Sequence, residues 1–80
     1  MSLRIIVKSD QIQEWITGRN GTPARKRNSD VGLRILFGEQ DSDYEPLTVD
    51  ELIEAMKLNH VALLVDQEAG KTFHKFVERG

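Results

Sequence analysis

The sequence predicts an α+β domain in which two helices pack on one face of a mostly antiparallel sheet, in the order β-α-β-β-α-β-β. Short segments rich in β-branched residues alternate with two segments whose apolar residues recur at helical spacing. Glycine, asparagine and proline residues mark turns between these segments. The chain has 80 residues, 39% hydrophobic and 30% charged, which is typical of one compact domain spanning residues 1–80.

The first part of the chain predicts a strand followed by a short helix. Residues 3–8 are rich in isoleucine and valine, as strands are. Ser9 and Asp10 offer side-chain oxygens that accept the free N–H groups of a first helical turn. Gly18 suits the left-handed position that closes a helix. The helix presents one apolar stripe that we expect to be buried: Ile12, Trp15 and Ile16.

The middle of the chain predicts two strands, two turns and a loop. Asn20-Gly21 is a turn dipeptide, because both residues tolerate positive φ. Residues 22–27 are expected to be extended, and residues 28–30 form the second turn. Alternating apolar residues over 31–37 predict a strand with one buried face. Residues 38–46 are rich in acids and poor in apolar residues, so we expect an acidic, mobile loop.

The strongest local signal predicts a helix at residues 48–58. Thr48 and Glu51 have the spacing of a capping box, in which each side chain accepts an N–H group near the other. Leu47 and Leu52 occupy the positions of a hydrophobic staple. The apolar face of this helix is Val49, Leu52, Ile53 and Met56.

The last part of the chain predicts two strands. Residues 61–65 are almost wholly apolar, which is typical of a central strand. Residues 67–70 form a hairpin loop, and residues 71–79 return as the final strand. Asn59 suits the closing position of the preceding helix.

Cysteine and several motifs that enzymes use are missing, so we expect no enzyme. The chain has no cysteine, which excludes disulfides, thiolate metal sites and a cysteine nucleophile. Its two histidines, His60 and His74, have no third ligand at metal-binding spacing, so we expect a structural or solvent-facing role. Phosphate-binding glycine loops and nucleophile elbows are also absent from the sequence. We therefore expect no catalytic residue, cofactor or bound metal.

The net charge of −2 hides an uneven distribution. Residues 1–34 carry a net charge of +4, residues 35–70 carry −8, and residues 71–80 carry +2. If these segments keep separate faces, patches of opposite sign result, and such patches bear on partners. The sequence has neither an apolar run near the ~18 residues that span a membrane nor a signal peptide, so we expect a cytoplasmic location.

Basic chemistry is concentrated in residues 18–27, which hold four of the eleven basic residues and no acid. The candidate partner-binding residues are Arg19, Arg25, Lys26 and Arg27, which could contact nucleic-acid phosphates or an acidic protein. A structural role is the alternative. Arg19 would then complement a helix C-terminus, and Arg25 and Arg27 would protect an edge strand. The acidity of the whole chain opposes nucleic-acid binding.

Two functional hypotheses remain open at this point. In the first, the chain is a small non-catalytic binding module whose partner, a nucleic acid or an acidic protein, contacts residues 19–27. In the second, it is a homo-oligomeric structural protein, in which an exposed sheet edge and opposed charges associate chain with chain. The sequence does not separate the two.

Motifs along nearly the whole chain resemble those of a family of small, uncharacterised bacterial proteins. The family shares a helix with a tryptophan, a Gly-x-Pro-Ala segment, a Leu-Arg-Ile strand, an acidic helix, an Ala-Leu strand and a closing strand. The matching residues are Trp15, Gly21-Thr22-Pro23-Ala24, Leu33-Arg34-Ile35, Asp50-Glu51, Ala62-Leu63-Leu64 and Phe73-His74-Lys75-Phe76-Val77-Glu78-Arg79. Relatives often have a second tryptophan where this chain has residues 48–53 without one.

Some members of this family carry a glucan-branching-enzyme label. A chain of 80 residues cannot contain the catalytic barrel of such an enzyme, which needs about 250 residues. The resemblance therefore implies a compact cytoplasmic domain and no activity.

Overall fold

The structure, a computed structural model, describes residues 2–29 and 32–79. These residues form two helices and six strands, which confirms the predicted α+β class. Residues 30 and 31, where the second expected turn meets the expected strand 31–37, lie outside the described residues. The elements are β1 (Leu3–Ile6), α1 (Ser9–Thr17), β2 (Thr22–Lys26), β3 (Leu33–Leu36), β4 (Tyr44–Pro46), α2 (Val49–Leu58), β5 (Val61–Asp66) and β6 (His74–Glu78).

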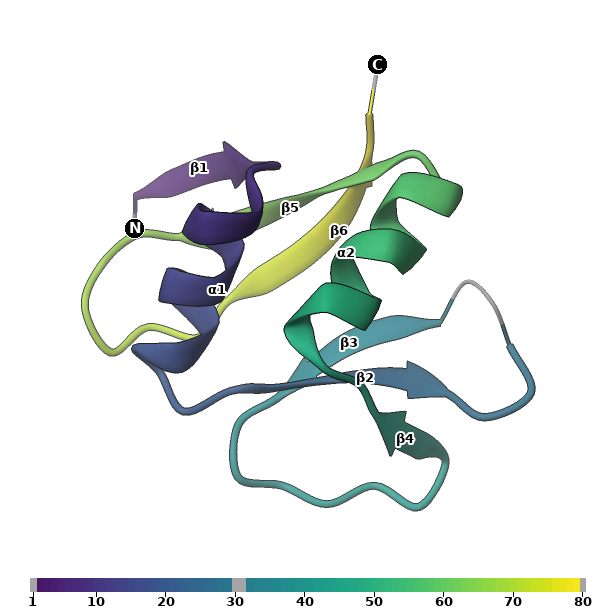
Figure 1. The fold of residues 1–80 in the computed structure, drawn as a ribbon. Helices are drawn as coiled ribbons and strands as arrows, with labels where there is room; N and C mark the ends of the chain where they lie inside the picture. Colours follow the sequence, from purple (N-terminus) through teal and green to yellow (C-terminus); the bar gives the residue numbers. More distant parts are fainter. Residues whose placement is uncertain (1, 30–31, 80) are drawn as a thin grey trace.

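The strands form two antiparallel sheets instead of the single sheet expected (Figure 1). Sheet A has the strand order β1-β5-β6, and sheet B has the order β3-β2-β4. A side chain joins the two sheets where the edge strands β3 and β6 meet. The backbone N–H of Ile35 in β3 donates to Nε2 of His74 in β6 over 3.2 Å. At this contact the acceptor of the Ile35 N–H is therefore an imidazole and not a backbone carbonyl of β6.

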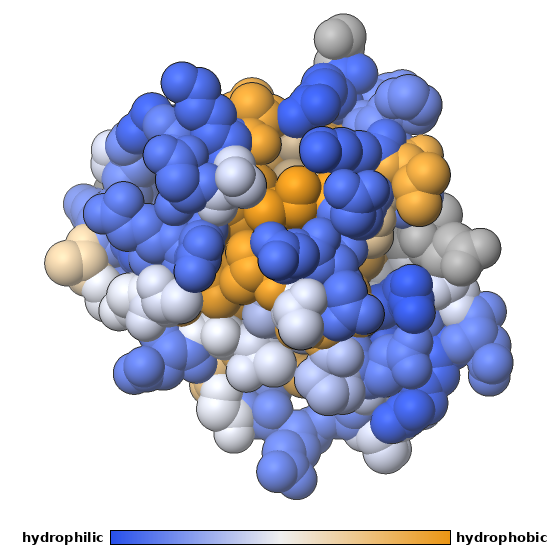
Figure 2. Space-filling view, in the orientation of Figure 1, coloured by the Kyte–Doolittle hydropathy of each residue, from blue (hydrophilic) through white to orange (hydrophobic). Residues whose placement is uncertain are grey.

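One core lies between the helices and both sheets. The apolar stripe expected in α1 and the apolar face expected in α2 both contribute to it. On the face seen in Figure 2, apolar side chains reach the surface between the two helices, with hydrophilic residues around them. The buried residues of this core are Ile6, Ile12, Trp15, Ile16, Ile35, Leu52, Met56, Leu63 and Val65.

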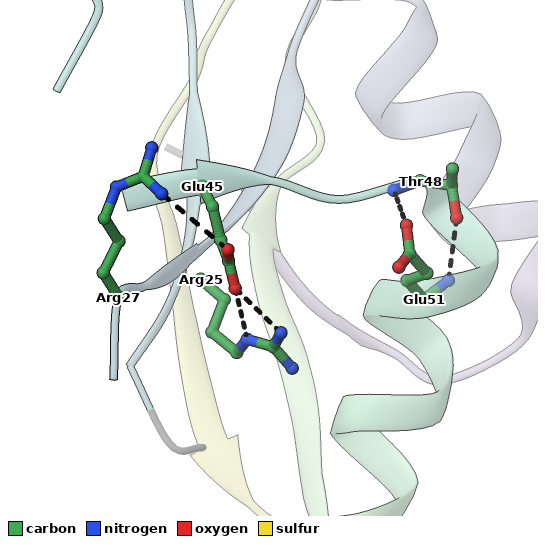
Figure 3. Close-up of polar contacts among 5 residues, drawn as sticks. All are labelled: Arg25, Arg27, Glu45, Thr48 and Glu51. Carbon is green, nitrogen blue, oxygen red and sulfur yellow. Dashed lines mark hydrogen bonds and ion pairs between the residues drawn. The ribbon is translucent and has the colours of Figure 1, made fainter. Parts of the chain in front are cut away.

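Helix α2 begins as the sequence predicts, but the left-handed position that closes it is His60, with a φ of 53°, and not Asn59. Thr48 is the N-cap residue, and its hydroxyl accepts the backbone N–H of Glu51 over 3.1 Å. The Glu51 carboxylate accepts the backbone N–H of Thr48 over 2.9 Å, which completes the capping box (Figure 3). Leu47 and Leu52, the two staple residues, are both buried. Asn59 is the C-cap residue. Local side-chain chemistry therefore defines both ends of this helix.

The ends of α1 differ from those expected. Lys8 is the N-cap residue without a side-chain cap, and Ser9 and Asp10 lie inside the first turn. There the Asp10 carboxylate interacts favourably with the helix dipole instead of capping the helix. Gly18 keeps a right-handed φ of −64°, and its N–H donates to a carbonyl within the helix. The left-handed position belongs to Asn20, with φ 54°, so the chain makes a further turn before β2 begins.

Strand β4 lies in the segment expected to be an acidic, mobile loop, so that prediction was wrong for residues 44–46. Arg25 of β2 lies directly opposite Glu45 of β4 in the ladder. Opposite charges across two strands favour their pairing. The two residues are 20 positions apart in the chain, so the local composition of the acidic segment does not reveal the pairing.

Candidate functional site

Arg19 follows α1 and holds the loop between β5 and β6. Its guanidinium donates to the backbone carbonyls of Asp66 over 3.3 Å, Glu68 over 2.9 Å and Lys71. It also donates to the carbonyl of Trp15 near the end of α1 and lies 4.5 Å from the centroid of the Trp15 ring. These contacts give Arg19 a structural role, because its donors are directed at carbonyl groups of its own chain.

Arg25 and Arg27 meet at one carboxylate, that of Glu45 (Figure 3). Arg25 Nη2 lies 2.8 Å from Glu45 Oε1, and Arg27 Nη1 lies 3.9 Å from Glu45 Oε2. Arg27 also donates from Nε to the carbonyl of Ser42 over 2.9 Å. Both guanidinium groups therefore contact the segment that the sequence analysis treated as a separate acidic loop.

Lys26 lies on the other face of β2. Successive side chains of a strand point to opposite faces, so Lys26 is directed away from Arg25 and lies opposite Tyr44 of β4. Its side chain is exposed. The structure thus brings Arg25 and Arg27 together and places Arg19 and Lys26 elsewhere. The four cations do not converge on one surface.

Acidic groups surround Arg25. A shallow hollow beside it is lined by Asp50, Glu51 and Glu54 of α2. The pKa of Glu51 is lowered, mainly because its carboxylate accepts the backbone N–H of Thr48, and the charge of Arg25 contributes in the same direction. The segments of opposite charge are therefore interleaved here and do not form separate patches, which weakens attraction for a polyanion.

Sheet A has an exposed apolar surface that the sequence did not predict. In β1, Ile6 points into the core, whereas Leu3 and Ile5 point to the opposite face. The exposed fractions are 45% for Leu3, 59% for Ile5 and 42% for the next alternate residue, Val7. Ile5 lies beside Leu64 of β5 in the ladder, so the apolar surface continues across the sheet. We call Leu3, Ile5 and Val7 the β1 row.

The backbone N–H and C=O groups of Leu3 and Ile5 point away from β5. The carbonyl of Ser2 accepts the N–H of Gln67 over 2.7 Å, one step beyond the pairing of Leu3 with Asp66. Backbone bonding in an antiparallel pair alternates along the strand, so Arg4 and Ile6 also face β5. The N–H and C=O groups of Leu3 and Ile5 therefore point outward, and β1 is an edge strand of sheet A that Val7 directly follows.

The other edges of the two sheets are protected. Strands β3 and β6 face each other across the contact of Ile35 with His74. Strand β4 is three residues long and ends at Pro46, which has no N–H to donate. Within the described residues, no strand pairs with the outer side of β1. Natural proteins usually protect such edges, so an apolar, open one indicates a place for another strand.

The signal for this surface was present in the sequence. Residues 3, 5 and 7 are apolar, and residue 6 on the opposite face is apolar as well. A strand with apolar residues on both faces is expected at the centre of a sheet. Only the structure shows that this strand lies at an edge.

Within residues 2–29 and 32–79, no cluster of three histidine or acidic side chains could hold a metal ion. No helix in that part of the chain is long and apolar enough to cross a membrane. The chain matches no protein-family model, no curated protein and no solved structure.

Proposed function

We propose that this protein is a non-catalytic binding module that binds another protein through the β1 row and the edge of β1. One observation carries the proposal. Three of the five exposed large apolar side chains in the described residues lie within the five residues 3–7, on β1 and the residue that follows it, and the edge of this strand is open. A partner strand added there gains backbone hydrogen bonds and covers these side chains.

Binding of an extended peptide tests the proposed function. The probe is a fluorescein-labelled peptide of alternating valine and lysine, which can pair with β1 and place its valines beside the β1 row. We expect the wild type to raise the polarisation of the probe, and Ile5→Lys to abolish the rise.

Leu58→Lys is the matched control, because Leu58 is 80% exposed and lies on α2. It should bind the peptide as the wild type does. The proposal is wrong if the wild type does not bind, or if Ile5→Lys binds as well as Leu58→Lys.

A second candidate function is weak binding of nucleic acid or another polyanion by Arg25, Lys26 and Arg27. The side chains of Lys26 and Arg27 are exposed, so both cations are accessible to a phosphate. Three phosphate contacts at about 0.9 each predict a slope of log K against log salt no steeper than about −3.

A low-salt polarisation titration with mixed-sequence DNA and RNA checks this candidate. The triple variant Arg25→Ala/Lys26→Ala/Arg27→Ala should lose the binding. If the wild type and the triple variant give the same curve, the basic segment is not a polyanion site.

A further inference from the structure

We propose that the partner strand is β1 of a second copy of this chain. The two β1 strands pair antiparallel across a two-fold axis that passes beside Ile5, giving one six-stranded sheet in the order β6-β5-β1-β1-β5-β6. This inference rests on the proposed function and names its partner. Three arguments support it: the backbone pattern, the charges and the apolar surface.

The backbone groups of the β1 row are arranged symmetrically. Leu3 and Ile5 face outward, and Val7 continues the alternation one residue beyond β1, so that Ile5 is at the centre of the row. Pairing across a two-fold axis at Ile5 places Ile5 opposite Ile5 of the second copy, and Leu3 opposite Val7. Each of these pairs can exchange N–H···O=C bonds, because outward residues meet outward residues. The same patch serves both copies, as a two-fold interface requires.

The charges of β1 select this register. Outward residues must meet outward residues, so alternative registers differ by steps of two. If the second copy shifts by two residues in one direction, Arg4 lies opposite Arg4 of that copy. If it shifts by two residues in the other direction, Arg4 lies opposite Lys8. Like charges directly opposite each other destabilise strand pairs. The register centred on Ile5 instead places Arg4 opposite Ile6 and Lys8 opposite Ser2.

The side chains of the β1 row gain apolar neighbours in this register. All of its members lie on the outer face of sheet A, and the second copy adds an identical row on the same face. Burial of this exposed apolar surface favours association. The contact is small, so we expect a reversible dimer like those with interfaces below about 1,200 Å².

Light scattering over a concentration series tests the dimer. The mass of the wild type should rise from 9.1 kDa toward twice that value as the concentration increases from about 10 µM to about 1 mM, the range expected of a small interface. Ile5→Lys should stay at 9.1 kDa, because it places like charges opposite each other at the axis. Leu58→Lys should dimerise like the wild type.

A pair of charge variants tests the register. Leu3→Glu and Val7→Lys should each weaken the dimer, because a charge then lies opposite an apolar residue. Leu3→Glu/Val7→Lys should restore it, since opposite charges face each other twice in the register centred on Ile5. Failure of the double variant to regain dimerisation would overturn this register.

Cysteine cross-linking gives an independent readout, because the natural chain has no cysteine. Paired residues of this kind have Cα atoms about 5.5 Å apart, within disulfide reach. Under mild oxidation Ile5→Cys should form a covalent dimer faster than Leu58→Cys, although Leu58 is the more exposed. Equal rates would contradict the two-fold pairing.

The proposed function and this inference can fail separately. If the wild type remains monomeric but still binds the valine–lysine peptide, β1 is a binding edge and its partner is a different chain. If the wild type neither dimerises nor binds the peptide, both are wrong.

Discussion

At the scale of single residues, neighbours decide what each cation of the basic segment does. Arg19 illustrates this most clearly, because its guanidinium contacts backbone carbonyls in the loop that closes sheet A. An arginine that follows a glycine in an exposed turn is a reasonable candidate for binding a phosphate. The carbonyl groups that it meets lie about 50 positions away in the chain, a separation that local reasoning does not bridge.

Arg19→Ala should lower the free energy of unfolding by about 1–2 kcal/mol, because charge-assisted hydrogen bonds to partly buried carbonyls are lost. Urea denaturation followed by Trp15 fluorescence measures this. Lys26→Ala is the control and should stay within about 0.5 kcal/mol of the wild type, as exposed substitutions do. Equal midpoints for the two variants would show that the hydrogen bonds of Arg19 contribute nothing to stability.

At the scale of elements, the sequence predicts a structure defined by local contacts well and a structure defined by long-range strand pairing poorly. The capping box and the staple of α2 are local, so the sequence predicts this helix to within a residue. Strand β4 pairs with β2 and places Glu45 opposite Arg25, whereas its local composition indicates a loop. The left-handed residue after α1 is Asn20 and not Gly18, because the final turn continues beyond the glycine.

Thr48→Ala should lower the free energy of unfolding by about 1 kcal/mol, because the N–H of Glu51 loses its acceptor. Thr48→Ser keeps a hydroxyl and should remain close to the wild type. Thermal denaturation of the wild type and the two variants measures these differences in stability. An unchanged midpoint in Thr48→Ala would mean that the cap does not stabilise α2.

At the scale of the whole molecule, His74 connects the two sheets, because its ring in β6 accepts a hydrogen bond from β3. Its Nε2 accepts from Ile35, its Nδ1 lies 3.1 Å from the carbonyl of Thr72, and its ring packs near those of Trp15 and Phe37. The sequence predicts a structural or solvent-facing role for this histidine. Its partners lie on other elements, so the sequence indicates the role only in general terms.

His74→Phe keeps a ring of similar size but leaves the partly buried N–H of Ile35 without its acceptor. We expect a loss of about 1–3 kcal/mol in the free energy of unfolding. His74→Gln offers a side-chain carbonyl oxygen and should lose less. Chemical denaturation compares the stabilities of the two variants. If His74→Phe is as stable as the wild type, the contact between β3 and β6 needs no hydrogen bond.

The proposed binding surface could not be predicted from the sequence, because it depends on how all the strands pair. Composition directed attention to the charged residues 19–27, whereas the structure pairs Arg25 and Arg27 with Glu45 and leaves an apolar row open at the edge of β1. The apolar alternation of β1 is visible in the sequence. Its position at an edge follows from the pairing of all the other strands.

Amide hydrogen exchange of β1 at low and high protein concentration tests the central claim most directly. In the monomer, the N–H groups of Leu3 and Ile5 face outward and that of Val7 lies beyond the last pair of the ladder, so all three should exchange rapidly, whereas those of Arg4 and Ile6 are bonded to β5. We predict that Leu3, Ile5 and Val7 become protected at high concentration, while Arg4 and Ile6 stay protected throughout. Rapid exchange of the β1 row at high concentration would contradict the account.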